Sequence, residues 1–192
     1  MKKMLFGVLF GLAAILGQGC ATTQITAFKD PDTGARKLKN VLIVVASSDL
    51  RDRMAIEKAI VEKLTAQGIQ AQPYTTVFPP TRKYTEQEMR ESLAAKGFTE
   101  VLFLSPTGSG VTVTGAISQT TAFPGPSAMG VTGFVRRLEK TFQVEIMAVE
   151  NSKTIWMAST QSAVGRGIGD HEMIVESLTE NILAQLKKDG LI

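Results

Sequence analysis

Cysteine, histidine and tryptophan each occur only once among the 192 residues, as Cys20, His171 and Trp156. The usual zinc sites need several histidines or thiols, so they are excluded, and no disulfide can form within the chain. A large excess of positive charge is also missing. The 21 basic residues stand against 18 acidic ones, and without Lys2 and Lys3 at the N-terminus 19 basic residues remain. This balance excludes a strongly basic nucleic-acid-binding protein.

The first 21 residues have the layout of a bacterial export signal. Lys2 and Lys3 precede an almost unbroken apolar run at residues 4–16, and small residues follow at 17–21. The run is shorter than the roughly 20 residues that a membrane-spanning helix needs. We therefore predict a signal peptide over residues 1–19.

The single cysteine stands at the end of this apolar run. The segment resembles a lipoprotein signal, which implies that Cys20 becomes the acylated first residue of the mature protein. Ala21 then implies transport to the outer membrane, with the protein on its periplasmic face. The alternative is ordinary cleavage after Ala21, which discards Cys20, since Gly19 and Ala21 fit a small-x-small pattern. Residues 20–39 are polar and turn-rich and are predicted to be a lipid-anchored tether.

The chain beyond residue 39 begins with alternating strands and helices. Short apolar runs predict buried strands at residues 41–46 and 101–104, and a weak alternation of apolar and polar residues suggests another at 69–74. The segment at 69–74 contains Pro73 and is predicted to be an edge strand at best. Ser47, Ser48 and Asp49 follow the first strand and supply N-cap chemistry for a helix. Thr85 and Glu88 have the spacing of a capping box for a second helix. This β-α-β-α-β order with short connections predicts a parallel sheet.

Charge is absent from residues 101–135. Within residues 105–133, 19 of the 29 are Gly, Ser, Thr or Pro, a composition typical of flexible segments. We predict a flexible uncharged insertion at 105–133, with a weak strand at 111–113. The alternatives for this segment are a surface that contacts a partner and hairpins that insert into a membrane on assembly.

The last third of the chain predicts an antiparallel hairpin and a helix. Apolar and polar residues alternate over 138–146, and a second run containing Trp156 follows a turn at 150–153. Asp170 then caps a last amphipathic helix. The predicted fold class is α/β. A β-α-β-α-β unit is followed by an antiparallel hairpin and a C-terminal helix, in a mixed sheet with helices packed on it, as a single domain over 40–192.

Three of these features together resemble one group of bacterial envelope lipoproteins: the signal with Cys20, the β-α-β-α-β unit, and the hairpin at 142–156 with the closing helix. The group includes the penicillin-binding-protein activator lipoproteins, the curli-secretion lipoprotein and the N-terminal domain of TolB. Its members act mainly by binding other envelope proteins or by assembling. The resemblance therefore implies no catalytic residues.

Five residues are candidates for contact with a partner. Four of them follow the first predicted strand as a dense charge run, where open α/β sheets often bind ligands: Asp49, Arg51, Asp52 and Arg53. A solvated face with weak ion pairs is the alternative for this run. The fifth is Trp156, which either anchors an interface or packs in the core.

Two other features have less specific patterns. His171 follows Asp170 at a helix start, and no Gly-x-Ser-x-Gly elbow accompanies it, so we expect an exposed first-turn residue. The run at 165–169 contains three glycines and Arg166 and is expected to be a simple link, because Asp170 would repel a bound phosphate.

The sequence thus favours a lipid-anchored, non-enzymatic interaction or scaffold protein of the bacterial envelope. Its expected partners are the membrane, through N-terminal acyl chains, and other envelope proteins, with a homo-oligomer as a further form. No cofactor, metal or nucleic acid is expected. The alternative function is a subunit of an oligomeric export or pore assembly. A more distant alternative is an envelope hydrolase, which requires His171 to lie beside a carboxylate or a serine.

Overall fold

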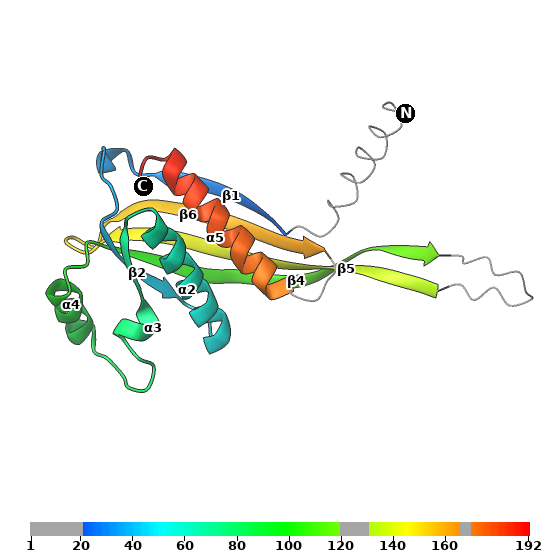
Figure 1. The fold of residues 1–192 in the computed structure, drawn as a ribbon, viewed down its shortest axis with the longest axis horizontal. Helices are drawn as coiled ribbons and strands as arrows, with labels where there is room; N and C mark the ends of the chain where they lie inside the picture. Colours follow the sequence, from blue (N-terminus) through cyan, green and yellow to red (C-terminus); the bar gives the residue numbers. More distant parts are fainter. Residues whose placement is uncertain (1–20, 120–130, 166–169) are drawn as a thin grey trace, which may run out of the picture.

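The computed structural model describes residues 21–119, 131–165 and 170–192. Six strands form one sheet in the order β1-β6-β5-β4-β2-β3 (Figure 1). The strands are β1 (Thr22–Lys29), β2 (Asn40–Val45), β3 (Gln70–Pro73), β4 (Glu100–Gln119), β5 (Val131–Ala148) and β6 (Thr154–Gly165). The helices are η1 (Pro31–Thr33), α2 (Leu50–Ala66), α3 (Tyr74–Val77), α4 (Glu86–Ala95) and α5 (Asp170–Lys188).

Some of the predicted features lie outside these described ranges. They are the signal peptide at 1–19, the acylated Cys20, the middle of the predicted insertion at 120–130, and residues 166–169 of the glycine-rich link. Among the helices of the described ranges, none is long and apolar enough to cross a membrane.

The sheet is mixed, as predicted. β2 pairs in parallel with β3 and with β4, and the remaining pairs, β4–β5, β5–β6 and β1–β6, are antiparallel. The β-α-β-α-β unit, the hairpin and the C-terminal helix all form. The α/β fold class is therefore confirmed.

The sheet is covered on one face and only partly covered on the other. On the first face, α2 and α5 bury the main core, in which Ile60, Leu178 and Ile182 are fully shielded from solvent. On the second face, α3 and α4 cover a smaller cluster around Leu42, Phe78 and Phe98.

The second face is open over β1 and β6. Phe28 of β1 is 61% exposed and Met157 of β6 is 40% exposed. Both side chains are large and apolar, and the two residues lie opposite each other in the β1–β6 pairing. This part of the sheet therefore presents apolar surface to solvent.

Two of the predicted helix caps form, because their side chains satisfy backbone N–H groups that the first helical turn leaves unpaired. Of Ser47, Ser48 and Asp49, it is Asp49 that caps α2. Asp49 accepts hydrogen bonds from the backbone N–H groups of Arg51 (2.8 Å) and Asp52 (3.3 Å). Thr85 and Glu88 form the capping box of α4, in which the Thr85 N–H donates to Glu88 Oε2 over 2.7 Å. This hydrogen bond holds the pKa of the Glu88 carboxyl below its ordinary value.

The predicted tether is wrong for residues 22–29, which form strand β1 at one edge of the sheet. Its alternate side chains face the helices: Ile25 and Ala27 pack against the main core, and Thr23 Oγ1 lies 2.8 Å from Ser162 Oγ and 2.9 Å from Ser177 Oγ. The polar composition of the segment hides this pattern of burial. Only Ala21 separates Cys20 from β1.

The later part of the predicted tether is also held to the domain. Arg36 donates to Glu100 Oε1 through Nε (3.0 Å) and Nη2 (2.9 Å), and its Nη1 lies 2.8 Å from Glu150 Oε1. The hydrogen bond to Glu150, followed by that to Glu100, raises the pKa of the Arg36 guanidinium. Lys153 and Asp30 pair over 2.8 Å nearby, and this hydrogen bond lowers the pKa of Asp30 and raises that of Lys153.

The flexible insertion predicted at 105–133 is wrong for its two described ends. β4 runs without interruption to Gln119, and β5 begins at Val131, so residues 105–119 and 131–133 are strand. Backbone pairing between the two strands, from Glu100 opposite Ala148 to Gln119 opposite Val131, stabilises a segment whose composition suggests a loop. The weak strand expected at 111–113 is a part of this long pairing.

β4 and β5 extend beyond the rest of the sheet as a two-stranded ribbon (Figure 1). The last pair between β5 and β6 is Arg137 of β5 opposite Gly165 of β6. On the other side of β5, Thr112 of β4 lies opposite the same Arg137. We define the ribbon as residues 113–119 of β4 and 131–136 of β5. Its longer strand spans about 23 Å.

Candidate functional site

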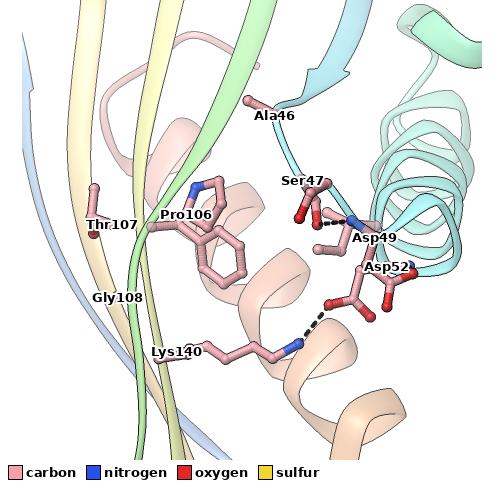
Figure 2. A pocket seen from close by; sticks show the side chains of 12 residues that line it. Ala46, Ser47, Asp49, Asp52, Pro106, Thr107, Gly108 and Lys140 are labelled. Atoms are coloured by element: carbon pink, nitrogen blue, oxygen red, sulfur yellow. Dashed lines mark hydrogen bonds and ion pairs between the residues drawn. The ribbon is translucent and has the colours of Figure 1, made fainter.

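The predicted charge run borders a cleft at the carboxyl end of β2. The cleft has a volume of about 550 Å³ and lies between the loop that enters α2 and a bend in β4 (Figure 2). Its lining residues are mostly small and polar, above a floor of Ile56, Pro106 and Phe142. Open α/β sheets often bind ligands at such strand ends.

A β-bulge shapes the β4 side of this cleft. Pro106 pairs with Phe142 and Gly108 pairs with Thr141, so Thr107 is an extra residue in the backbone register of β4. Its Oγ1 donates to Thr141 Oγ1 over 3.1 Å. A Cβ atom on Gly108 would lie 2.8 Å from Thr141 Oγ1. A larger residue at position 108 would therefore force the Thr141 side chain to shift at this bulge.

The four residues of the charge run have different roles. Asp49 caps α2, and Arg53 Nη2 donates to the backbone carbonyl of Ser47 over 2.6 Å, which holds the loop against the helix. Arg51 is exposed. Asp52 points toward Lys140 across the cleft (Figure 2). The structure therefore uses two of these residues to order the loop and one to connect α2 with β5.

Asp52, Lys140 and His171 form a charged cluster contributed by α2, β5 and α5. Lys140 Nζ donates to Asp52 Oδ2 over 2.8 Å and lies 3.5 Å from His171 Nδ1. His171 Nε2 lies 3.4 Å from Asp52 Oδ1, at an angle that forms no hydrogen bond. An ammonium group can only donate, so the contact between Lys140 and His171 is a hydrogen bond in the tautomer whose Nδ1 is the acceptor.

The cluster bears on the hydrolase alternative. His171 does lie beside a carboxylate, and it is partly shielded rather than freely exposed, with 33% of its side chain accessible. Among the described residues, however, its hydrogen-bond contact is with Lys140, and no hydroxyl group reaches it. A general base needs a free nitrogen directed at the nucleophile. The absence of enzymatic activity stays a prediction.

Trp156 does not lie at the surface. It is 1% exposed, and its Nε1–H donates to Asp189 Oδ2 over 2.7 Å. Of the two alternatives for this residue, packing in the core is the one that the structure shows. The exposed side chain at this end of β6 is that of the next residue, Met157.

The start of β1 and the base of the ribbon lie at the same end of the sheet. The strand registers place Thr22 opposite Ala163, Ala163 opposite Glu139, and Glu139 opposite Gly110. Because neighbouring strands are about 4.8 Å apart, Thr22 and Gly110 are about 14 Å apart along this row. The ribbon begins a few residues beyond Gly110.

The contact between Lys140 and Asp52 and the ribbon formed by β4 and β5 could not be predicted from the sequence. Lys140 lies 88 residues from Asp52 along the chain, so no spacing pattern connects them. The ribbon has one detectable signal, the alternation at 111–113, which its glycine- and serine-rich composition obscures.

In the described part of the chain, no three His, Cys, Asp or Glu side chains gather as metal ligands would.

Comparison with known proteins yields similarity to solved structures only. No protein-family model matches the chain, and no curated protein matches it. Two structures of the PelC dodecamer from Paraburkholderia phytofirmans each align over 85% of this chain. One covers 96% of the PelC chain at 14% identity with a TM-score of 0.49, and the other, of a point-substituted form, covers 98% at 15% identity with a TM-score of 0.48. Lipoprotein GNA1162 from Neisseria meningitidis aligns over 76% of this chain and 99% of its own, at 13% identity with a TM-score of 0.44. At these values the similarities carry no functional conclusion for this chain.

Proposed function

We propose that this protein is a lipid-anchored, non-enzymatic subunit of an assembly at the bacterial outer membrane, and that the ribbon contacts the other members of that assembly. The signal-like N-terminus and Cys20 support the lipid anchor. The partner distinguishes two forms of this function. A different envelope protein would make the chain a scaffold, and further copies of the chain would make it a subunit of an oligomeric export or pore assembly.

The observation that carries the proposal is that, among the residues the structure describes, no third strand pairs with the ribbon. Within the described residues, β2 pairs with β4 only as far as Leu104, and β6 pairs with β5 only as far as Arg137. Two-stranded ribbons are marginally stable in water, and their outer edges leave backbone N–H and C=O groups unpaired. Another chain that pairs or packs with the ribbon would satisfy these groups.

The position of the ribbon supports action at a membrane. Only Ala21 stands between Cys20 and Thr22 in the sequence, and two residues of extended chain span at most about 7 Å. An acyl anchor there would hold against the membrane the same end of the sheet from which the ribbon projects. Members of a membrane-bound assembly would therefore lie within reach of the ribbon.

Photo-cross-linking in the native envelope tests this proposal. A photoreactive amino acid replaces Val113 or Phe134 of the ribbon in the full-length chain, and Glu62 on α2, with 64% of its side chain exposed, is the matched control. We expect covalent adducts from both ribbon positions and none from the control. An adduct with another protein indicates the scaffold, and one with a second copy indicates the oligomer. Absence of adducts from both ribbon positions, or equal adducts from Glu62, would contradict the proposal.

The lipid anchor is tested separately by the intact mass of protein extracted from membranes. We expect acylated Cys20 at the N-terminus, and the Cys20→Ala variant is expected to leave the membrane fraction. An unmodified chain that begins at Thr22 would exclude the anchor.

A variant with a shortened ribbon tests the contact with the assembly independently of the lipid anchor. Replacing residues 113–136 with Asn-Gly retains every β5–β6 pair, because Thr112 and Arg137 lie opposite each other and a two-residue turn can join them. This ribbon-shortened variant should stay anchored and lose co-sedimentation with the assembly. Co-sedimentation at the wild-type level would show that the ribbon is not the contact.

A further inference from the structure

The two edges of the sheet differ in how well they are protected against pairing with another strand. β3 has four residues and ends at Pro73, and short strands and proline both prevent further pairing. β1 has eight residues, contains no proline, and pairs with β6 residue for residue without a bulge. Within the described residues, its outer edge has no neighbouring strand. β1 is therefore the edge that is available for pairing.

The rest of the domain holds β1 in place. Thr23 Oγ1 contacts hydroxyl groups of β6 and α5, Ile25 and Ala27 pack against the main core, and Lys29 Nζ donates to the backbone carbonyl of Asp189 over 3.1 Å. A strand fixed in this way loses little conformational entropy when another strand pairs with it.

The outward-facing side of β1 is uncharged and partly apolar. Gln24, Thr26 and Phe28 are exposed, and Phe28 lies opposite Met157 of β6, so two exposed apolar side chains of this face are neighbours. Lys29 is the only charged residue of β1. A partner selected by charge would need more than this single cation, whereas short polar and apolar side chains complement a copy of themselves.

We propose that a second copy of this chain pairs along β1, antiparallel about a two-fold axis at Thr26, and joins the two sheets into one. Directly opposite residues of an antiparallel pair point to the same face of the sheet. In β1 the even-numbered residues 24–28 face solvent and Ile25 and Ala27 face the core, so an even position must pair with an even position and an odd position with an odd one. This register places Phe28 opposite Gln24, Ile25 opposite Ala27, and Lys29 opposite Thr23 of the second copy. No like charges oppose each other. The contact is separate from the ribbon.

Charge substitution at the symmetry axis tests this inference. In the full chain in detergent, Thr26→Lys or Thr26→Glu alone places two like charges opposite each other, and the mass measured by light scattering is expected to fall twofold. An equal mixture of the two variants should restore the wild-type mass, because Lys then faces Glu. Gln70→Lys, at an exposed position of the opposite edge, is the matched control and should change nothing. A wild-type monomer, or a mass that neither variant lowers, would overturn the inference.

A cysteine at the same position gives a second readout that does not depend on other contacts between copies. Thr26→Cys is expected to form a covalent dimer on oxidation, and Gln70→Cys is not. The ribbon-shortened chain should form the same dimer. Failure of Thr26→Cys to cross-link, with the ribbon adducts still present, contradicts only the pairing of β1. Loss of the ribbon adducts with the dimer retained contradicts only the proposed function.

Discussion

Lys140 Nζ lies 2.8 Å from Asp52 Oδ2 and connects the middle of β5 with the first turn of α2. Only 20% of the lysine side chain and 25% of the aspartate side chain are exposed. Partial burial strengthens the pair relative to ion pairs on the open surface, because solvent screens it less. His171 adds α5 to the same connection. The cluster therefore joins three elements that are distant in the sequence.

A double-mutant cycle measures the strength of this pair. We expect Asp52→Asn and Lys140→Met each to lower the free energy of unfolding by about 1–2 kcal/mol. The double variant should lose less than the sum, by about 1 kcal/mol. Lys58 and Glu62, an exposed pair four residues apart on α2, are the control, with an expected coupling below about 0.5 kcal/mol. Urea unfolding provides the values, and equal coupling in both pairs would contradict the prediction.

Glu57 is a buried carboxylate that holds α2 to β2 and α3. It accepts hydrogen bonds from Thr75 Oγ1 (2.8 Å), Thr75 N (3.1 Å) and Val45 N (3.4 Å). Glu57→Ala leaves two backbone N–H groups unpaired and should lower the free energy of unfolding by about 2–4 kcal/mol. Glu57→Gln retains an acceptor and should lose less. Glu62→Ala on the exposed side of the helix should cost less than about 0.5 kcal/mol, and a similar loss in both alanine variants would refute this role.

The hydrogen bond between Trp156 and Asp189 anchors the end of α5 to β6. Asp189→Ala leaves a buried indole N–H without an acceptor, so we expect a loss of about 1–2 kcal/mol in unfolding free energy. Asp189→Asn keeps an acceptor oxygen and should be close to wild type. Trp156 is the sole tryptophan, so its fluorescence reports the unfolding of each variant directly. An unchanged midpoint for Asp189→Ala would show that this hydrogen bond does not stabilise the fold.

The capping box of α4 should make stability depend on pH. The hydrogen bond from the Thr85 N–H lowers the pKa of Glu88 below 4.5, its ordinary value. The contribution of the carboxylate is therefore complete above pH 4.5 and is lost as the pH falls through the lowered pKa of the folded protein. Denaturant midpoints measured near neutral pH and in acid should differ less for Glu88→Gln than for wild type. The same pH dependence in both proteins would argue against this role.

Local sequence patterns were sufficient to predict much of the parallel half of the fold. Asp49 and the pair Thr85 and Glu88 cap their helices as predicted, since capping depends on residues within one turn. Pro73 likewise marks an edge strand, because proline lacks the N–H that a central strand needs. The α/β class follows from these elements.

The contacts between distant segments were decided only by the tertiary structure. β1 is a strand because β6 pairs with it, from Thr22 opposite Ala163 onward, and the ribbon exists because β4 and β5 pair over a segment whose composition suggests a loop. The burial of Trp156 and the contact between Lys140 and Asp52 have the same cause, because each depends on how the sheet packs against its helices. Composition and periodicity describe the local preferences of a chain, whereas strand pairing and burial depend on residues that lie far away along it.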